Sequence, residues 1–226
     1  MNENLKTTWA STQNEEDGMN NDHYPLWIEM IEKMTEKDLT NLTVFDFGCN
    51  QGQFLRVLYS KKPFLNGFGV DIAKNSIEIA NQNKKELPVE YHATDDISFL
   101  DNSIDIAFSH EVIYLLEDLD RHVKDIYSVL KAKGVYYVAL GCHTDNPTWP
   151  AIRKYVREKI KSNFCDYSLD YISDIFRKNG FIISAQKFKL NGFIKISDNS
   201  SCFHSVMQFL NYYDDYKILF KFEKKD

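Results

Sequence analysis

Hydrophobic residues alternate between two spacings along the middle of this chain. Short apolar runs typical of buried β-strands occupy residues 42–47, 67–71, 89–93, 104–109 and 135–140. Apolar residues at helical spacing occur between most of these runs, at residues 51–60, 75–85 and 119–131. Strands separated by helices pair in parallel through right-handed crossovers, so the pattern predicts an open, doubly wound α/β sheet.

The N-terminal region has a different pattern. Residues 1–22 are polar with isolated apolar positions, which predicts a mobile arm. From His23 onward, four apolar residues follow the spacing i, i+3, i+4 and i+7, namely Trp27, Met30, Ile31 and Met34. This spacing predicts a short helix that ends before the polar stretch 35–41.

The C-terminal third is less regular than the middle. Its pattern predicts helices at 151–161 and 168–179 and strands at 181–190 and 216–223. Residues 191–215, between the last two strands, show no clear periodicity.

The composition narrows the classes of function. The chain has 226 residues, with 27 Lys and Arg against 33 Asp and Glu, so its formal net charge is −6. A negative net charge provides no general attraction to nucleic-acid phosphates or anionic lipids. No apolar run approaches the roughly 18 residues of a membrane span, and residues 1–11 lack an apolar signal core. We therefore expect a cytoplasmic protein without a nucleic-acid or membrane partner.

The most informative segment runs from the first strand of the predicted sheet into a helix. It reads Asp-Phe-Gly-Cys-Asn-Gln-Gly at residues 46–52. Gly48 can adopt a positive φ and expose its backbone to a ligand, while Gly52 begins a helix whose free N–H groups face the same crevice. Ligands of doubly wound sheets bind at the carboxyl ends of the strands. This segment is therefore a predicted ligand-binding turn.

Two acidic residues indicate the kind of ligand. Asp46 ends its strand, where a carboxylate repels a pyrophosphate but suits an ammonium or sulfonium group. The turn also lacks the G-x-G-x-x-G spacing of dinucleotide-binding proteins. Asp71 ends the next strand, where an acid can accept both ribose hydroxyls of an adenosine. An adenosine with a cationic tail indicates S-adenosylmethionine.

These residues resemble a known family. Residues 46–52 resemble the first motif of class I S-adenosylmethionine-dependent methyltransferases (type 11-like), and Asp71 resembles their ribose-binding acid. Three later segments resemble family motifs in the family's order, at residues 93–97, 103–110 and 129–134. The resemblance implies a Rossmann-like α/β/α sandwich with a mostly parallel sheet of seven strands, the last of them antiparallel.

The resemblance also implies which residues bind the cofactor. In this family an acid after the third strand approaches the adenine, and the fourth strand lies beneath the methionine moiety. The cofactor-binding residues expected on this basis are Asp46, Gly48, Cys49, Asn50, Gly52, Asp71, Ile72, Asp95, Asp96, Ile97, Ser109 and His110. Asn50 departs from the family pattern because it replaces the middle glycine. Asparagine tolerates a positive φ, so we expect a glycine-like turn there.

Residues that would act on the acceptor are harder to identify. A base is needed only when the acceptor must lose a proton, and His110, Glu111, Tyr114 and His143 are candidates near the predicted pocket. Tyr114, His143 and Trp149 are candidates for the acceptor pocket itself, although lone histidines and aromatics are more often structural. The sequence assigns no catalytic residue.

We expect a single domain over residues 1–226. It would comprise an N-terminal arm and helix (1–41), a cofactor-binding core (42–141), and a substrate-side segment with the closing strands (142–226). The expected activity is in-line transfer of a methyl group from S-adenosylmethionine to a small molecule, without a metal ion. Two alternatives stay open: a nicotinamide-dependent oxidoreductase on a similar sheet, and a non-catalytic module that binds S-adenosylmethionine or a partner.

Overall fold

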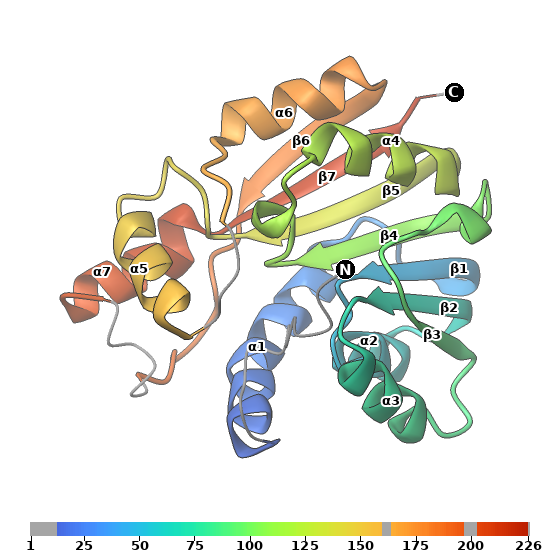
Figure 1. Ribbon diagram of the computed structural model, residues 1–226, viewed down its shortest axis with the longest axis horizontal. Helices are drawn as coiled ribbons and strands as arrows, with labels where there is room; N and C mark the ends of the chain where they lie inside the picture. Colours follow the sequence, from blue (N-terminus) through green and yellow to red (C-terminus); the bar gives the residue numbers. More distant parts are fainter. Residues whose placement is uncertain (1–12, 160–163, 197–202, 226) are drawn as a thin grey trace.

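A computed structural model describes residues 13–159, 164–196 and 203–225. Its seven-stranded sheet has the order β3-β2-β1-β4-β5-β7-β6 (Figure 1). The strands are β1 (Leu39–Phe47), β2 (Phe64–Asp71), β3 (Val89–Ala93), β4 (Ile104–His110), β5 (Leu130–Leu140), β6 (Phe181–Lys187) and β7 (Ile218–Lys224). Strands β1 to β5 are parallel, and β7 runs antiparallel to β5 and β6. The predicted doubly wound sheet with an antiparallel last strand is confirmed.

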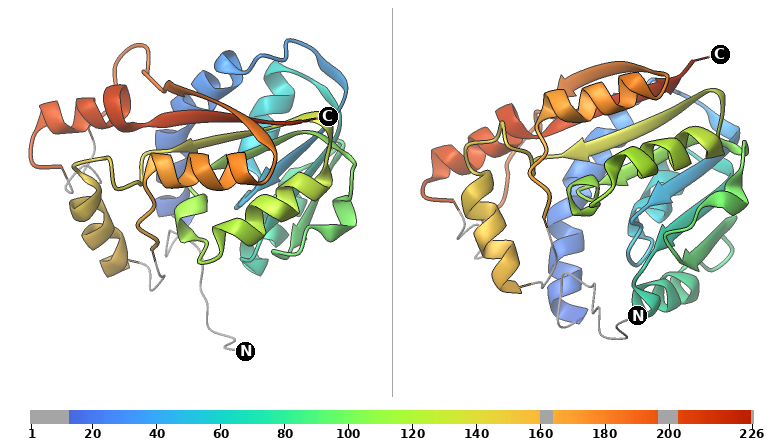
Figure 2. Two further views of the ribbon diagram at one scale, coloured as in Figure 1. Left: turned by 90° about the horizontal axis from the view of Figure 1, so that it is seen from above. Right: turned by 45° about the horizontal axis from the view of Figure 1, so that its top comes forward.

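Helices cover both faces of this sheet, as the two views in Figure 2 show. One layer contains α1 (Gln13–Lys33), α2 (Gln53–Lys61) and α3 (Lys74–Asn83). The opposite layer contains α4 (Leu119–Val129) and α6 (Leu169–Lys178). Two further helices, α5 (Trp149–Lys159) and α7 (Val206–Asn211), lie beyond the carboxyl ends of β4 and β5 (Figure 1). The predicted α/β/α sandwich is confirmed.

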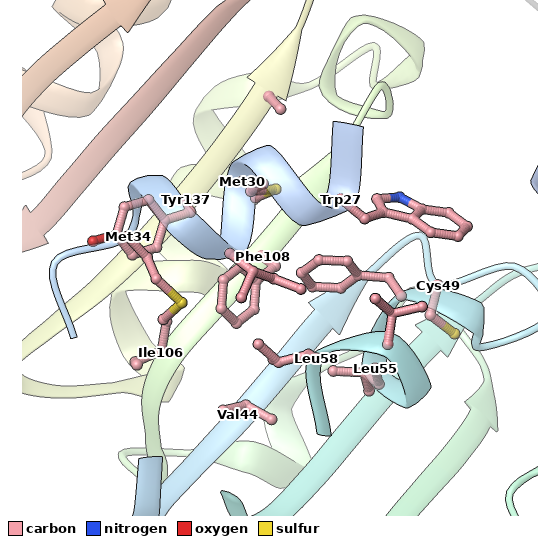
Figure 3. Close-up of a cluster of buried hydrophobic side chains, with 14 of the residues drawn as sticks. Trp27, Met30, Met34, Val44, Cys49, Leu55, Leu58, Ile106, Phe108 and Tyr137 are labelled. Atoms are coloured by element: carbon pink, nitrogen blue, oxygen red, sulfur yellow. The ribbon is translucent and has the colours of Figure 1, made fainter. Parts of the chain in front are cut away.

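Neighbouring residues of each central strand enter different cores. In β1, Val44 packs into the cluster beneath α1, α2 and α3, while Phe45 packs into the cluster beneath α4 and α6. Figure 3 shows the first cluster, with Trp27 and Met30 of α1 lying over Phe108 of β4. Burial on both faces explains why the strands appear in the sequence as nearly continuous apolar runs.

Helix α1 is longer than the sequence predicted. The expected mobile arm is wrong for residues 13–22, which form the first half of α1; residues 1–12 lie outside the described residues. Among the residues of α1 whose side chains the structure describes, those that pack on the core lie in its second half, such as Leu26 and Met30. Asn21 and Asp22 are exposed, and residues 13–22 have no apolar stripe from which a helix could be predicted.

The boundary between α4 and β5 also differs from the prediction. The helix expected over 119–131 ends at Val129, and β5 begins at Leu130. Leu130 is fully buried and pairs with Ile104 of β4, so its apolar side chain suits a strand as well as a helix. Lys131 bonds Asp105 at the amino end of β4, with 2.7 Å between Nζ and Oδ2.

The C-terminal elements follow the prediction to within a few residues, and the unassigned interval 191–215 contains α7. A π-helical turn, Tyr212–Tyr216, follows that helix and leads into β7. None of the helices in the described ranges is long and apolar enough to cross a membrane.

A substitution of Phe176 in α6 tests the packing of the cluster beneath α4 and α6. Its ring stacks on Phe222 of β7 with 3.5 Å between the ring centroids, and its side chain is fully buried. We predict that Phe176→Ala lowers the free energy of unfolding by about 3–5 kcal/mol, because it removes buried apolar surface and leaves a cavity. In the control Phe193→Ala, which alters a fully exposed ring, we expect a change within about 0.5 kcal/mol. Urea denaturation measures both, and equal losses would contradict the prediction.

Candidate functional site

A cavity of about 760 Å³ lies at the carboxyl ends of β1, β2 and β4. This volume is within the roughly 300–1,000 Å³ of pockets that hold small molecules. The strand order reverses between β1 and β4, and such switch points are where doubly wound sheets bind ligands. Helix α1 and the residues around the π-helical turn complete the wall. The cavity is therefore the candidate site.

The turn after β1 is held in a left-handed conformation. Gly48 has a φ of +79°, and Asn50 has a φ of +47°, as the sequence predicted for a glycine-like position. The Asn50 N–H donates to Asp71 Oδ2 over 3.0 Å, and the N–H groups of Gly48 and Cys49 both donate to the carbonyl oxygen of Val70. These bonds attach the turn after β1 to the end of β2.

Asp71 has a structural role and a partly buried position in the cavity wall. Its Oδ1 accepts the N–H of Ala73, the residue that directly precedes α3. Burial raises the pKa of Asp71, although the backbone N–H groups of Ala73, Asn50 and Ile72 oppose that rise. The carboxylate is thus fixed in place before any ligand arrives.

Asp46 is the most perturbed acid of the cavity. Its side chain is almost completely buried, and burial, together with the nearby charge of Asp71, raises its pKa to about 8. Without a ligand, Asp46 is protonated at neutral pH. A cationic group in the cavity would stabilise the carboxylate form.

The structure brings most of the predicted cofactor and acceptor residues to one wall. Those that line the cavity are Asp46, Gly48, Cys49, Asn50, Asp71, Ile72, Asp95, His110 and Tyr114. Six other predicted residues do not line it: Gly52, Asp96, Ile97, Ser109, His143 and Trp149. Each of these six has a structural role or position that accounts for its place outside the wall.

Three of the six lie in the turns after β1 and β3. Gly52 has a φ of +71°, and a Cβ there would lie 2.4 Å from the Tyr91 ring. A glycine at this position therefore leaves room for the Tyr91 ring rather than for a ligand. Asp96 accepts the N–H of Ser98 in an exposed turn. Ile97 belongs to the core beneath α4.

The other three lie at or beyond the ends of β4 and β5. Ser109 is fully buried in β4. His143 lies 2.7 Å, through Nε2, from the carbonyl oxygen of Tyr216, which anchors the loop after β5. Trp149 packs edge-on behind Tyr114 at 5.6 Å and donates to Asp166. Trp149 therefore supports the lining residue Tyr114 from behind, and His143 holds the loop after β5 to Tyr216.

Helix α1 contributes residues that the sequence assigned only to packing or to the arm. The indole N–H of Trp27 donates to His110 Nδ1 over 3.2 Å, so His110 carries its proton on Nε2, which is buried without a partner. The His23 ring meets His110 edge-on at 4.9 Å. Burial, reinforced by Lys217, lowers the pKa of His110 well below its usual value and that of His23 to about 4. Both rings are therefore neutral at pH 7.

Glu111 connects the end of β4 to β7. It has a φ of +57°, and its Oε1 accepts the Gly141 N–H over 2.9 Å, accepts the Tyr212 hydroxyl over 3.2 Å, and pairs with Lys217. Burial alone would raise the pKa of Glu111, but Lys217 and these hydrogen bonds outweigh it and hold the pKa below its usual value. Glu111 Oε2 is buried without a partner.

The sequence considered Glu111 as a base but missed Tyr212 and Tyr213, which also line the cavity. Both lie in the interval without periodicity, and a π-helical turn has no simple sequence pattern. Over the described residues, no group of three or more His, Cys, Asp or Glu side chains is placed to hold a metal ion.

Comparison with known proteins identifies a family model that matches the middle of this chain. Residues 45–138 match the family described as "Methyltransferase domain". The chain is 29% identical over 97 residues to human mitochondrial arginine-hydroxylase NDUFAF5, covering 42% of this chain and 27% of that protein. It is 24% identical over 110 residues to the ubiquinone biosynthesis O-methyltransferase of Pelagibacter ubique, covering 47% of this chain and 45% of that protein. The chain thus spans less than half the length of these two relatives.

Solved structures match over more of the chain. A chain in the complex of a Haloferax volcanii methyltransferase with the Trm112 methyltransferase activator superposes with a TM-score of 0.81 at 20% identity, covering 95% of both chains. A phosphoethanolamine N-methyltransferase of Haemonchus contortus, solved with S-adenosylhomocysteine, gives 0.72 at 20% identity, covering 96% of this chain and 60% of that chain. At these identities the likeness establishes the fold. Residues 45–138 thus match a methyltransferase domain, and most of the chain shares the fold of solved methyltransferase structures, one of which contains S-adenosylhomocysteine.

Proposed function

We propose that this chain transfers a methyl group from S-adenosylmethionine to a small molecule. The observation that carries the proposal is the cavity at the switch point, which has two chemically different ends. One end contains the acids after β1, β2 and β3. The other is enclosed by α1 and by aromatic residues of the chain after β5.

The acidic end suits the cofactor. Asp71 is positioned to accept ribose hydroxyls, the turn at Gly48 to Asn50 offers backbone next to it, and Asp46 can ionise beside a cation. When bound, S-adenosylmethionine supplies an electrophilic methyl group on a sulfonium. The protein's part is to orient the acceptor in line with that methyl group and to exclude water.

The enclosed end favours a small acceptor over a macromolecule. Trp27 of α1 and Tyr212 of the π-helical turn line the same cavity from different parts of the chain, which restricts what can enter. The net charge of −6 gives no general attraction to a polynucleotide. A cytoplasmic location is likewise proposed from the sequence alone.

A labelled-methyl assay tests the function. We predict that protein incubated with methyl-labelled S-adenosylmethionine and a metabolite extract forms a labelled small molecule, because the cavity encloses its acceptor. Parallel incubations with total RNA, DNA and protein serve as controls. Label found chiefly in a macromolecule would contradict the proposed acceptor class, and cofactor binding without any transfer would favour a non-catalytic module.

Asn50 provides a test of the cofactor turn. We predict that Asn50→Gly retains S-adenosylmethionine binding, because glycine adopts the observed φ of +47° freely. Asn50→Val should weaken binding by on the order of 1–3 kcal/mol, since a β-branched residue resists a positive φ. Isothermal calorimetry compares the two variants, with circular dichroism to establish folding. Equal affinities would show that the turn does not contact the cofactor.

Asp46 predicts a proton linked to cofactor binding. The free protein holds Asp46 protonated below its pKa of about 8, whereas a bound cation stabilises the carboxylate. We therefore predict that S-adenosylmethionine binding releases a proton at pH 7. The affinity should rise toward pH 8, by up to about tenfold per pH unit, and then level off. Calorimetry in two buffers of different ionisation enthalpy measures the release.

Two variants and one competing ligand complete that experiment. Asp46→Asn should reduce the proton release, whereas Asp95→Asn, which alters an exposed acid of the same cavity, should preserve it. NAD should not bind comparably, because the carboxylate of Asp71 disfavours a pyrophosphate. Unchanged proton release in Asp46→Asn, or preferential NAD binding, would contradict the assignment.

A further inference from the structure

The charges in the cavity wall restrict the acceptor. Among the described residues that line it, the acids are Asp22, Asp71, Asp95, Glu111 and Glu117, together with Asp46, which is protonated until a cation binds. No lysine or arginine from the described part of the chain lines it. An acceptor carrying a phosphate or carboxylate would therefore meet like charge and would lack a cationic partner.

The nearby lysine does not change this balance. Lys217 is 1% exposed, does not line the cavity and pairs with Oε1 of Glu111. His23 and His110 are neutral, for the reasons given above. The polar groups that face the acceptor end thus offer it no positive charge.

Glu111 presents an oxygen that needs a donor. Only 12% of its side chain is exposed, and Oε2 is buried without a hydrogen-bond partner, whereas Oε1 has three. An unsatisfied carboxylate oxygen in a protein interior costs free energy that a donor from a ligand would recover. Because Glu111 lines the cavity, a ligand that brings an N–H or O–H group to Oε2 would supply the missing donor.

Aromatic rings surround the same end. Trp27, Tyr114, Tyr212 and Tyr213 line the cavity together with Glu111. Aromatic faces attract organic cations and also pack against apolar carbon, and a carboxylate among them selects nitrogen that carries or develops positive charge. A hydroxyl acceptor could also donate a hydrogen bond to Oε2, but a neutral hydroxyl would not be stabilised by the aromatic faces and the carboxylate in the way that a positively charged nitrogen is.

We propose that the methyl acceptor is an amine without an anionic group, and that Glu111 Oε2 accepts a hydrogen bond from its nitrogen. This proposal rests on the methyltransferase function proposed above. It makes Glu111 a catalytic residue, because it touches the reacting atom.

The role of Glu111 follows from the balance of charge in the reaction. The lone pair of a neutral amine forms a bond to the methyl carbon, the carbon–sulfur bond breaks, and its electron pair stays on sulfur. The nitrogen gains the positive charge that sulfur loses. Glu111, held ionised by Lys217, stabilises that developing charge, and the proton later leaves the methylated ammonium for water.

The position of the label provides the first test. Labelled product from the metabolite extract is analysed by mass spectrometry for the atom that carries the new methyl group. A methyl group on nitrogen, in a product without phosphate or carboxylate, is expected. A methyl group on oxygen, carbon or sulfur, or a product bearing either anion, would overturn the amine proposal while leaving methyl transfer established. Absence of both cofactor binding and product would instead contradict the proposed function.

Removing the carboxylate provides the second test. Glu111→Gln alone leaves Lys217 buried without its partner and can unfold the protein, so Glu111→Gln combined with Lys217→Met is made beside it. The variant that folds should form the labelled amine about 10- to 150-fold more slowly, the range for losing a hydrogen bond to a charged group. Its affinity for S-adenosylmethionine should stay within about twofold of the unaltered protein, because Glu111 faces the acceptor end.

A binding measurement separates recognition from activity. Phenethylamine and 3-phenylpropionate are titrated into the S-adenosylhomocysteine complex, with binding followed by calorimetry. The amine should bind at least about tenfold more tightly than the carboxylate, and the Glu111 variant should show a smaller preference, because the other acids of the wall remain. Glu90→Gln is the matched control, since it makes the same change on the exposed side of β3 and should alter neither measurement. An equal or reversed preference in the unaltered protein would overturn the proposal.

Discussion

Burial of the central sheet on both faces is the constraint on which the rest of this molecule depends. In β5, Tyr136 and Tyr137 are neighbours, yet each is buried, one beneath α4 and α6 and the other beneath α1. A sheet covered in this way has no free face for chemistry, so polar groups that act on ligands must lie where strands end. Asp46, Asp71 and Glu111 each stand at or just beyond such an end.

Two sets of contacts convert these strand ends into an enclosed site. The Asn50–Asp71 hydrogen bond joins the turns after β1 and β2. The Trp27–His110 hydrogen bond and the ring contact of His23 hold α1 against the end of β4. A single cavity thus connects these turns with walls that come from distant parts of the chain.

Proteins that share this architecture act on chemically different acceptors. One neighbour is named for a substrate that carries phosphate, and others are named for geranyl diphosphate, although they share the sheet. The described wall of this cavity offers carboxylates and aromatic rings, with Lys217 already paired to Glu111. Shared backbone geometry therefore fixes where a ligand lies, while a few side chains decide which acceptor is tolerated.

The sequence by itself determined the sheet and the turns at the acidic end of the cavity, because both depend on local patterns. Apolar runs specify buried strands, and Asp46, Gly48, Asn50 and Asp71 lie within a few residues of strand ends that parallel pairing places together. Only the tertiary structure decided the acceptor end. Residues 13–22 join α1, Tyr212 lies in a π-helical turn, and Lys217 meets Glu111 across 106 positions. Such contacts form through packing between distant segments, so no local periodicity in the sequence predicts them.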